Sequence, residues 1–340
     1  MNLKCKISEL CNVTSSKRIF AADYQERGVP FFRGKEITEK YNGSISVSTE
    51  LFIARSKFIE IREKFGTPLP GDLLLTSVGT LGSTYVVQKG DEFYFKDGNI
   101  TWFRDFKGLD SKYFHYWLTA PEGRAELKKC TIGSSQSAYT IVLLKNMEIL
   151  RPSLKIQSDV ASILSAYDDL IENNMQRIAI LEETAQRIYE EWFVRFRFPR
   201  HEGVRMVESE LGLVPDGWSV STIGEVAAYI NRGLAPKYDD DAACLVINQK
   251  CIRAQRLNLS EARKQSKSVP VDKLVRRGDV LINSTGVGTL GRVAQVLETI
   301  ENCTVDTHVS IVRPSKHCNF DYFGMALLAR QENFEALAGC

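Results

Sequence analysis

The chain has 340 residues, of which 44% are hydrophobic and 25% are charged. This balance is typical of globular proteins, and with 10 Pro and 23 Gly it excludes disordered, collagen-like and low-complexity classes. The length favours two domains, because one hydrophobic core rarely serves more than about 250–300 residues. Lys and Arg number 44 and Asp and Glu 42, so the net charge is +2 and any polyanion site must be local.

The eight cysteines form no C-x-x-C pair and no zinc-knuckle spacing, which predicts reduced thiols and no bound metal. The N-terminal segment lacks the unbroken apolar stretch of a signal peptide. No window approaches the roughly 18 apolar residues of a membrane span. We therefore expect a cytoplasmic protein.

Much of the sequence occurs twice. The run PGDLLLTS at 70–77 returns as RGDVLINS at 277–284, and two extra residues then enter the second copy. The matches continue from 79–82 to 288–291, from 97–100 to 306–309 and from Arg104 to Arg313. Upstream, 31–35 matches 246–250. This ordered set indicates a duplicated domain.

Each copy is predicted to be an α/β domain of short strands. The apolar runs at 72–77 and 279–284 and the β-branched runs at 84–87 and 292–296 are typical of strands. Glycines between them suit a hairpin that needs positive φ or lets a phosphate backbone come close. The alternative is a simple turn without a binding role. The glycines are Gly79, Gly82, Gly286, Gly288 and Gly291.

A long helix is predicted between the copies, from about 154 to 198, with Pro152 before it and Pro199 after it. Residues alternating three and four positions apart form a heptad seam with one stutter. Asn174 lies in this seam, where a polar side chain fixes register at a cost in stability. The alternative is a solvated spacer helix, which needs no apolar seam. The seam consists of Ile156, Val160, Ile163, Tyr167, Ile171, Asn174, Ile178, Leu181, Ala185, Ile188 and Trp192.

Catalytic motifs are absent from the sequence. An amino-methyltransferase needs an N-P-P-aromatic type motif, and the chain contains no Pro-Pro pair. The segment from Gly28 to Lys35 has the wrong spacing for a phosphate-binding loop and places Glu36 where Ser or Thr is required. The chain is therefore predicted to be non-catalytic.

Positive charge is concentrated locally. Residues 250–292 hold ten basic and three acidic side chains, a net charge of +7, and residues 1–64 have a net charge of +4. Such clusters are typical of nucleic-acid contacts, although a single surface Lys or Arg more often only aids solubility. Arg and Asn can also read base edges, because Arg forms a pair of hydrogen bonds with guanine and Asn with adenine. The predicted DNA-binding residues are Arg33, Lys35, Ser77, Thr80 and Ser83 in the first copy, and Asn248, Lys250, Arg253, Ser284, Thr289 and Arg292 in the second.

These features together resemble one family, the DNA-specificity subunits of type I restriction-modification systems. The matching pieces are the Gly-Asp-Leu/Val-Leu strand with its Gly-x-x-Gly hairpin in both halves, Gly217-Trp218, and the segment RPSLxxQ at 151–157. The resemblance implies two target recognition domains, at 1–152 and 218–340, each reading half of a split double-stranded DNA site. It implies a coiled-coil helix at 153–200 and a linker at 201–217.

The resemblance also implies partners. Modification (methyltransferase) subunits dock on the helix, through residues such as Ile163, Tyr167, Ile171, Asn174, Ile178, Leu181, Ile188 and Trp192. Restriction subunits supply cleavage and translocation. S-adenosylmethionine, ATP and magnesium belong to those partners, and no cofactor is expected in this chain.

The second copy departs from the family pattern, because it lacks a counterpart to residues 132–200. We therefore expect a C-terminal truncation, natural or as a fragment, with a second helix missing. The unpaired seam then predicts a homodimer, in which two copies of the helix pair about a two-fold axis. The rival hypothesis is a coiled-coil protein-interaction scaffold without DNA binding.

Overall fold

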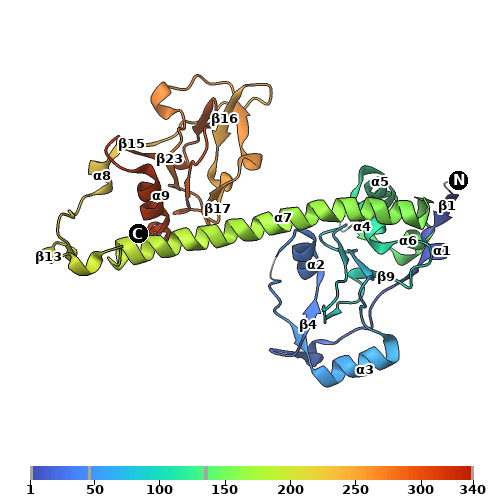
Figure 1. Cartoon of the computed structure of the whole chain (residues 1–340). Helices are drawn as coiled ribbons and strands as arrows, with labels where there is room; N and C mark the ends of the chain where they lie inside the picture. Colours follow the sequence, from blue (N-terminus) through green and yellow to red (C-terminus); the bar gives the residue numbers. More distant parts are fainter. Residues whose placement is uncertain (1–2, 45–46, 134–136, 338–340) are drawn as a thin grey trace. The chain divides into compact units, whose positions relative to one another are not determined.

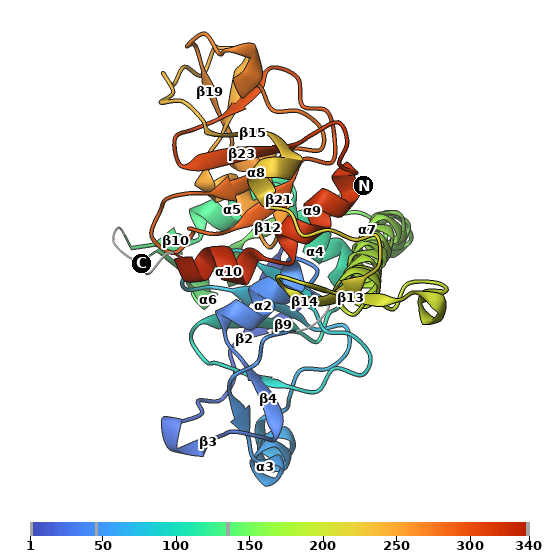
Figure 2. The same cartoon turned by 90° about the vertical axis from the view of Figure 1, so that its left-hand side faces the viewer.

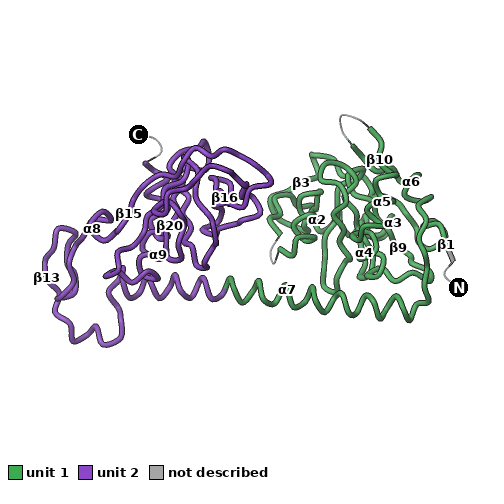
Figure 3. Tube along the Cα trace, turned by 90° about the horizontal axis from the view of Figure 1, so that it is seen from above, with its two compact units in different colours: residues 1–179 green, residues 180–340 purple. Residues whose placement is uncertain are grey.

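The computed structural model describes residues 3–44, 47–133 and 137–337. The chain divides into two compact units, residues 1–179 and residues 180–340, coloured separately in Figure 3. The division falls inside the long central helix, so each unit carries one part of it.

The first unit is built on an antiparallel sheet with the order β2-β9-β6-β7, of which Figure 1 labels β9. A second sheet has the order β3-β5-β4-β8, in which β4 and β8 are parallel. The strands are β2 (Asn12–Thr14), β3 (Tyr24–Gln25), β4 (Val29–Phe32), β5 (Phe52–Ile53), β6 (Leu73–Thr76), β7 (Thr84–Val86), β8 (Tyr94–Phe95) and β9 (Ile100–Arg104).

Strand β6 lies at the centre of the first unit, and all four of its residues are buried. This explains its unbroken apolar sequence, since both of its faces meet core side chains. Two strand pairs, β1 (Leu3–Lys6) with β12 (Glu148–Arg151) and β10 (Thr131–Ile132) with β11 (Ala138–Tyr139), complete the sheet structure. The helices are α1 (Ile7–Leu10), α2 (Gly34–Tyr41), α3 (Arg55–Phe65), α4 (Ser111–Thr119), α5 (Pro121–Lys129) and α6 (Ile141–Asn146).

The second unit repeats the same sheet, with the order β15-β23-β20-β21. Strands β16 and β22 are parallel, like β4 and β8. Helix α9 packs on β21 (Figure 2). The strands are β13 (Met206–Ser209), β14 (Gly212–Pro215), β15 (Ala227–Arg232), β16 (Cys244–Ile247), β17 (Ile252–Arg253), β18 (Arg256–Leu257), β19 (Arg263–Gln265), β20 (Val280–Asn283), β21 (Val293–Gln295), β22 (Cys303–Val305) and β23 (Val309–Pro314), and the helices are α8 (Ile223–Val226), α9 (Phe320–Leu328) and α10 (Gln331–Ala336).

Between the two strand-rich regions of the sequence runs α7 (Leu154–Tyr189), which continues as a π-helical turn over Glu190–Val194. The prediction of a long helix is confirmed, but it ends before residue 198. Phe196 has a φ of 57°, in the left-handed region, which ends the helix before Pro199. The predicted mixed α/β fold with a long helix is likewise confirmed.

Candidate nucleic-acid interface

In the first unit, Thr76 closes the loop between β6 and β7. Its N–H donates to the carbonyl of Ser83 (2.9 Å), its carbonyl accepts from the N–H of Gly82 (3.0 Å), and its hydroxyl oxygen accepts from the N–H of Ser83 (2.9 Å). Gly79 and Gly82 have φ values of 81° and 86°, which favour glycine. The predicted hairpin is therefore present.

Two of the three predicted DNA-binding residues of this hairpin are buried. Ser77 is 2% exposed and its hydroxyl lies 2.7 Å from the hydroxyl of Thr101, whereas Ser83 is 5% exposed and accepts a bond of 3.1 Å from the hydroxyl of Thr38. Thr80 is exposed. The two serines therefore hold the loop, and Thr80 lies on its surface.

Arg124 of α5 supports the same loop and was not predicted. Its Nη1 donates to the carbonyl of Gly82 (3.2 Å), and its Nη2 donates to the hydroxyl of Tyr41 in α2 (2.9 Å). A Cβ added at Gly82 would lie 2.6 Å from Nη1 of Arg124. The close approach explains this glycine, and nothing in the local sequence of α5 indicates the contact.

The predicted cations of the first unit are engaged by carboxylates. Arg33 and Lys35 both lie 3.0 Å from the carboxylate of Glu50, and Arg33 also lies 2.9 Å from the buried carboxylate of Glu36. Hydrogen bonds from Lys35 and Arg33 hold the pKa of Glu50 below its usual value. A phosphate group that binds Arg33 and Lys35 must therefore compete with Glu50.

In the second unit, Asn283 takes the place of Thr76. Its side-chain N–H₂ donates to the carbonyl of Gln249 (3.1 Å) and to the carbonyl of Thr289 (3.0 Å), while its backbone carbonyl accepts from Gly291 (2.9 Å). The buried side-chain oxygen of Asn283 has no hydrogen-bond donor among the residues that the structure describes. Asn283 thus ties the hairpin to the short 3-10 turn Gln249–Cys251.

This tie brings the predicted residues of the second copy close together in one region. Asn248 caps the 3-10 turn by accepting from the N–H of Lys250 (2.9 Å), and its N–H₂ donates to the carbonyl of Glu261 (2.8 Å). Ser284 bonds Ser310. The remaining predicted residues of this copy lie on the hairpin or on the neighbouring strand, namely Thr289, Arg292 and Arg253.

Arg253 is exposed and lies directly opposite Arg256 in the β17–β18 pair. Like charges in this position repel each other. Arg256 is neutralised by Glu182 of α7, with Nε of Arg256 at 2.9 Å from the carboxylate. The side chain of Arg253 has no such partner among the described residues, and neither has that of Lys250.

The two basic regions therefore differ in free positive charge. Eight of the twelve basic side chains at 1–64 form an ion pair with a carboxylate. Among the ten at 250–292, all of them in the described part of the chain, only Arg256 forms one. A polyanion meets unpaired cations in the second unit and paired ones in the first.

The aligned aspartates of the two Gly-Asp strands are structural. Asp72 accepts from the indole N–H of Trp102 (2.8 Å) and from the N–H of Leu69 (2.9 Å). Asp279 forms a bidentate pair with Arg313, at 2.7 and 2.8 Å. Both aspartates are buried, so they position the strand before each hairpin and do not reach a ligand.

Residues 3–183 match the family model of the type I restriction modification DNA specificity domain. This match covers more than half of the chain and includes the first hairpin and most of α7. The chain belongs to this family. The membership agrees with the predicted family.

Two curated proteins illustrate the relationship of this specificity-family chain. It is 29% identical over 193 residues to a putative type I restriction enzyme specificity subunit of Haemophilus influenzae, covering 56% of this chain and 46% of that protein. It is 31% identical over 171 residues to the type I restriction enzyme MjaIX specificity subunit of Methanocaldococcus jannaschii, covering 49% and 38%. The alignments thus span less than half of either relative.

The fold of this specificity-family chain also matches a solved structure, that of the S subunit of a type I restriction-modification system from M. genitalium. The TM-score is 0.58 at 15% identity, covering 99% of this chain and 79% of that chain. This similarity establishes the fold, which agrees with the predicted architecture.

Helix α7 of this specificity-family chain carries two different stripes. Gln157 and Ala161 are buried in the first unit, where the Gln157 side chain accepts from the N–H of Asp110 (2.7 Å) and donates to the carbonyl of Gly108 (3.2 Å). The predicted seam lies about a quarter turn away. All eight predicted docking residues are exposed, namely Ile163, Tyr167, Ile171, Asn174, Ile178, Leu181, Ile188 and Trp192.

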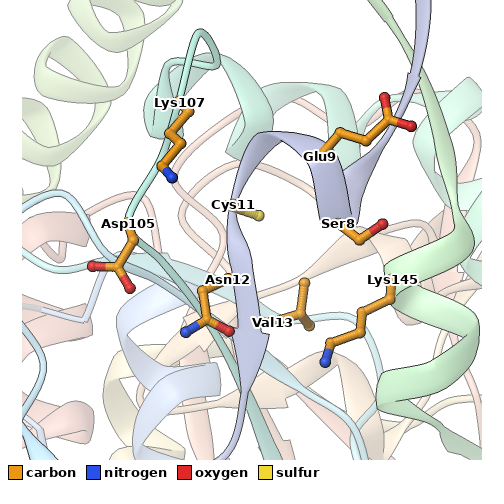
Figure 4. A pocket seen from close by; sticks show the side chains of 8 residues that line it. All are labelled: Ser8, Glu9, Cys11, Asn12, Val13, Asp105, Lys107 and Lys145. Atoms are coloured by element: carbon orange, nitrogen blue, oxygen red, sulfur yellow. The ribbon is translucent and has the colours of Figure 1, made fainter.

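A polar pocket lies at the start of the first unit, apart from the predicted site residues (Figure 4). Its charged lining residues are Glu9, Asp105, Lys107 and Lys145, so acids and bases balance. The described residues include no cluster of three metal-ligating side chains. Among the helices that the structure describes, α7 included, none has a stretch apolar enough to cross a bilayer.

Proposed function

We propose that this chain is the sequence-recognition component of a type I restriction-modification complex, and that each unit contacts one half of a split duplex site. The observation that carries the proposal is the duplicated sheet, in which equivalent strands, β6–β7 and β20–β21, each present a glycine hairpin. Two copies of one binding scaffold suit two half-sites. The recognition domains are then residues 1–152 and 218–340, with a helix at 153–200 and a linker at 201–217.

Within the hairpins and their neighbouring strands, we assign phosphate or base contacts to the members of the predicted set whose side chains reach solvent. Thr80, Lys250 and Arg253 are exposed and Thr289 and Arg292 are half-buried, whereas Ser77 and Ser83 act by holding the first loop. Arg33 and Lys35 reach DNA by exchanging Glu50 for phosphate. Asn248 and Ser284 position the second hairpin region through their own hydrogen bonds.

A salt titration of duplex binding tests the DNA-recognition proposal. Each phosphate that the protein neutralises should lower log K by about 0.9 per unit of log salt concentration. The measurement uses the full chain, alone and with modification subunits, on duplexes that contain and lack the methylated sequence of the system. Absence of duplex binding in both settings would favour the rival scaffold hypothesis, which the exposed seam of α7 also suits.

The seam of α7 supports a docking role for partners. In the proposed complex it binds modification subunits, which carry S-adenosylmethionine, and restriction subunits with ATP and magnesium complete the assembly. Burying one exposed Ile or Leu side chain contributes about 1.5–3 kcal/mol, so the eight predicted docking residues of the seam have ample capacity for a stable interface. This complex would act in the cytoplasm.

A second copy of the chain is the alternative cover for the seam, through an antiparallel helix pair about a two-fold axis. Sedimentation equilibrium at tens of micromolar tests this pairing, since a monomer has a mass of 38.4 kDa. Replacing Ile171 and Ile178 with Lys should dissociate a dimer. The matched control is Asn173→Lys with Gln176→Lys, on the opposite side of the helix, which should leave a dimer intact. A soluble monomer of the unmodified chain would refute self-pairing.

A further inference from the structure

The two hairpins share their scaffold and differ at their tips, where the second has two more residues. Recognition units built on one scaffold must differ in specificity through such loops. The longer tip reads Gly286-Val287-Gly288, and Val287 is 107% exposed, the highest value among the large apolar side chains that the structure describes. An apolar side chain with this exposure packs against no core and is open to a ligand.

Hydrogen bonds hold this tip in one shape. The carbonyl of Gly286 accepts from the N–H of Thr289 (3.2 Å) and from the N–H of Leu290 (3.0 Å). The carbonyl of Gly288 accepts from Nη2 of Arg292 (2.9 Å). Val287 therefore stands on a loop that is fastened on both sides, which suits a contact of defined geometry.

The flanking glycines leave the tip open. Gly286 and Gly288 have φ values of 115° and 73°, which strain any other residue. A Cβ added at Gly288 would meet no described atom within 4 Å, so this side of the tip is uncovered. Glycines on both sides of an apolar residue let the backbone approach a surface closely.

The residues around the tip indicate that the surface which it approaches is that of DNA. Lys250 and Arg253 are exposed without carboxylate partners among the described residues, and Asn283 ties the 3-10 turn of Lys250 to the hairpin. Such cations suit phosphates, whereas valine offers no hydrogen bond. The thymine C5-methyl group is the apolar feature of the major-groove edge. We propose, resting on the proposed DNA recognition, that Val287 is a specificity-determining residue that contacts a thymine methyl group.

The test removes the methyl group from the DNA and the side chain from the protein. Preferred duplexes are first selected from a random library with the full chain and its modification subunits. Each preferred thymine is then replaced by uracil. For the unmodified chain, one replacement should weaken binding roughly fourfold, the value of one buried methyl group. For Val287→Ala the same replacement should have almost no effect, and Val287→Ile should retain the sensitivity.

Leu297→Ala is the matched control, because Leu297 is 63% exposed after β21 and lies outside the tip. It should leave the uracil sensitivity unchanged. The inference is overturned, while the proposed function stands, if duplexes are selected but no thymine in them shows a uracil effect that Val287→Ala removes. The inference also fails if Val287→Ala lowers the melting temperature, since the side chain then packs against protein, or if it weakens all duplexes equally. Failure to select any sequence counts against the proposed function itself.

Discussion

The two units build the same four-stranded sheet but treat their charges differently. In the first unit, Arg33 and Lys35 are held by Glu50, whereas in the second unit Lys250 and Arg253 have no carboxylate partner among the described residues. The reverse holds in the interior. There the first unit satisfies Asp72 with neutral donors, and the second satisfies Asp279 with the guanidinium of Arg313. The two copies of the duplicated scaffold thus share a backbone fold but differ in which of their charged side chains are paired with an opposite charge.

The largest expected effect comes from removing the partner of Asp279 in the interior of the second unit. Arg313→Ala leaves the carboxylate of Asp279, which is 1% exposed on its side chain, without its cation, and should destabilise the second unit by about 3–5 kcal/mol. The aligned change Arg104→Ala removes a pair with the half-exposed Asp105 and the stacking of the guanidinium on Trp102, 4.5 Å from the ring centroid, and should cost only about 1–2 kcal/mol. Hydrogen exchange resolved by unit measures both. Equal losses in the two variants would show that the aligned pairs are equivalent.

A smaller effect is expected in the pH dependence of stability, in which the two buried aspartates should also differ. Burial raises the pKa of Asp72, so its contribution to stability is complete when the carboxyl is protonated and is lost as pH rises through the raised pKa. Asn at this position keeps an oxygen for Trp102 and Leu69 but carries no charge. Asp72→Asn should therefore gain stability relative to the unmodified chain as pH rises from below the usual pKa of an aspartate through the raised pKa of Asp72, by about 1 kcal/mol.

Its counterpart, Asp279→Asn, breaks the bidentate pair with Arg313 and should be destabilising at pH 7. Urea unfolding across the pH range, followed by unit-resolved hydrogen exchange, compares the two substitutions. If Asp72→Asn loses stability as pH rises, the carboxylate of Asp72 is stabilising and the contrast between the units is wrong.

The smallest expected effect concerns the surface half of the comparison. Glu50→Gln frees Lys35 and leaves Arg33 paired with Glu36 alone, and should raise duplex affinity at low salt by roughly two- to fivefold. Glu60→Gln is the matched control, because it frees Lys57 and Lys64 on α3, which carries no predicted DNA contact. An equal gain from both variants would point to net charge alone.

Sequence patterns predicted the features that do not depend on contacts between distant elements. Both hairpins and the long helix followed from residues close together in the chain, and the duplication followed from the comparison of two segments such as 70–77 and 277–284. The partners of Arg33 and Lys35 could not be predicted, because Glu50 meets them only after β4, α2 and β5 have folded together. Arg124 was missed for the same reason, since it meets Gly82 only through the packing of α5.

The end of α7 shows the limit of periodicity. The heptad pattern continues to Trp192 and predicts a helix as far as Pro199, but the left-handed Phe196 ends it earlier. Burial of the hairpin serines was equally hidden, because polar residues next to a predicted turn suggest exposure. Their partners come from other elements: the hydroxyl of Thr101 is hydrogen-bonded to that of Ser77, and the hydroxyl of Thr38 donates to that of Ser83.

The central claim is that the second unit offers DNA more free positive charge than the first, and two double variants test it directly. Lys250→Gln with Arg253→Gln should lower the slope of log K against log salt by up to about 1.8. Arg33→Gln with Lys35→Gln removes the same formal charge but should change the slope by less than half as much, because Glu36 and Glu50 already neutralise these cations. An equal or larger loss of slope from the first-unit variant would contradict the account.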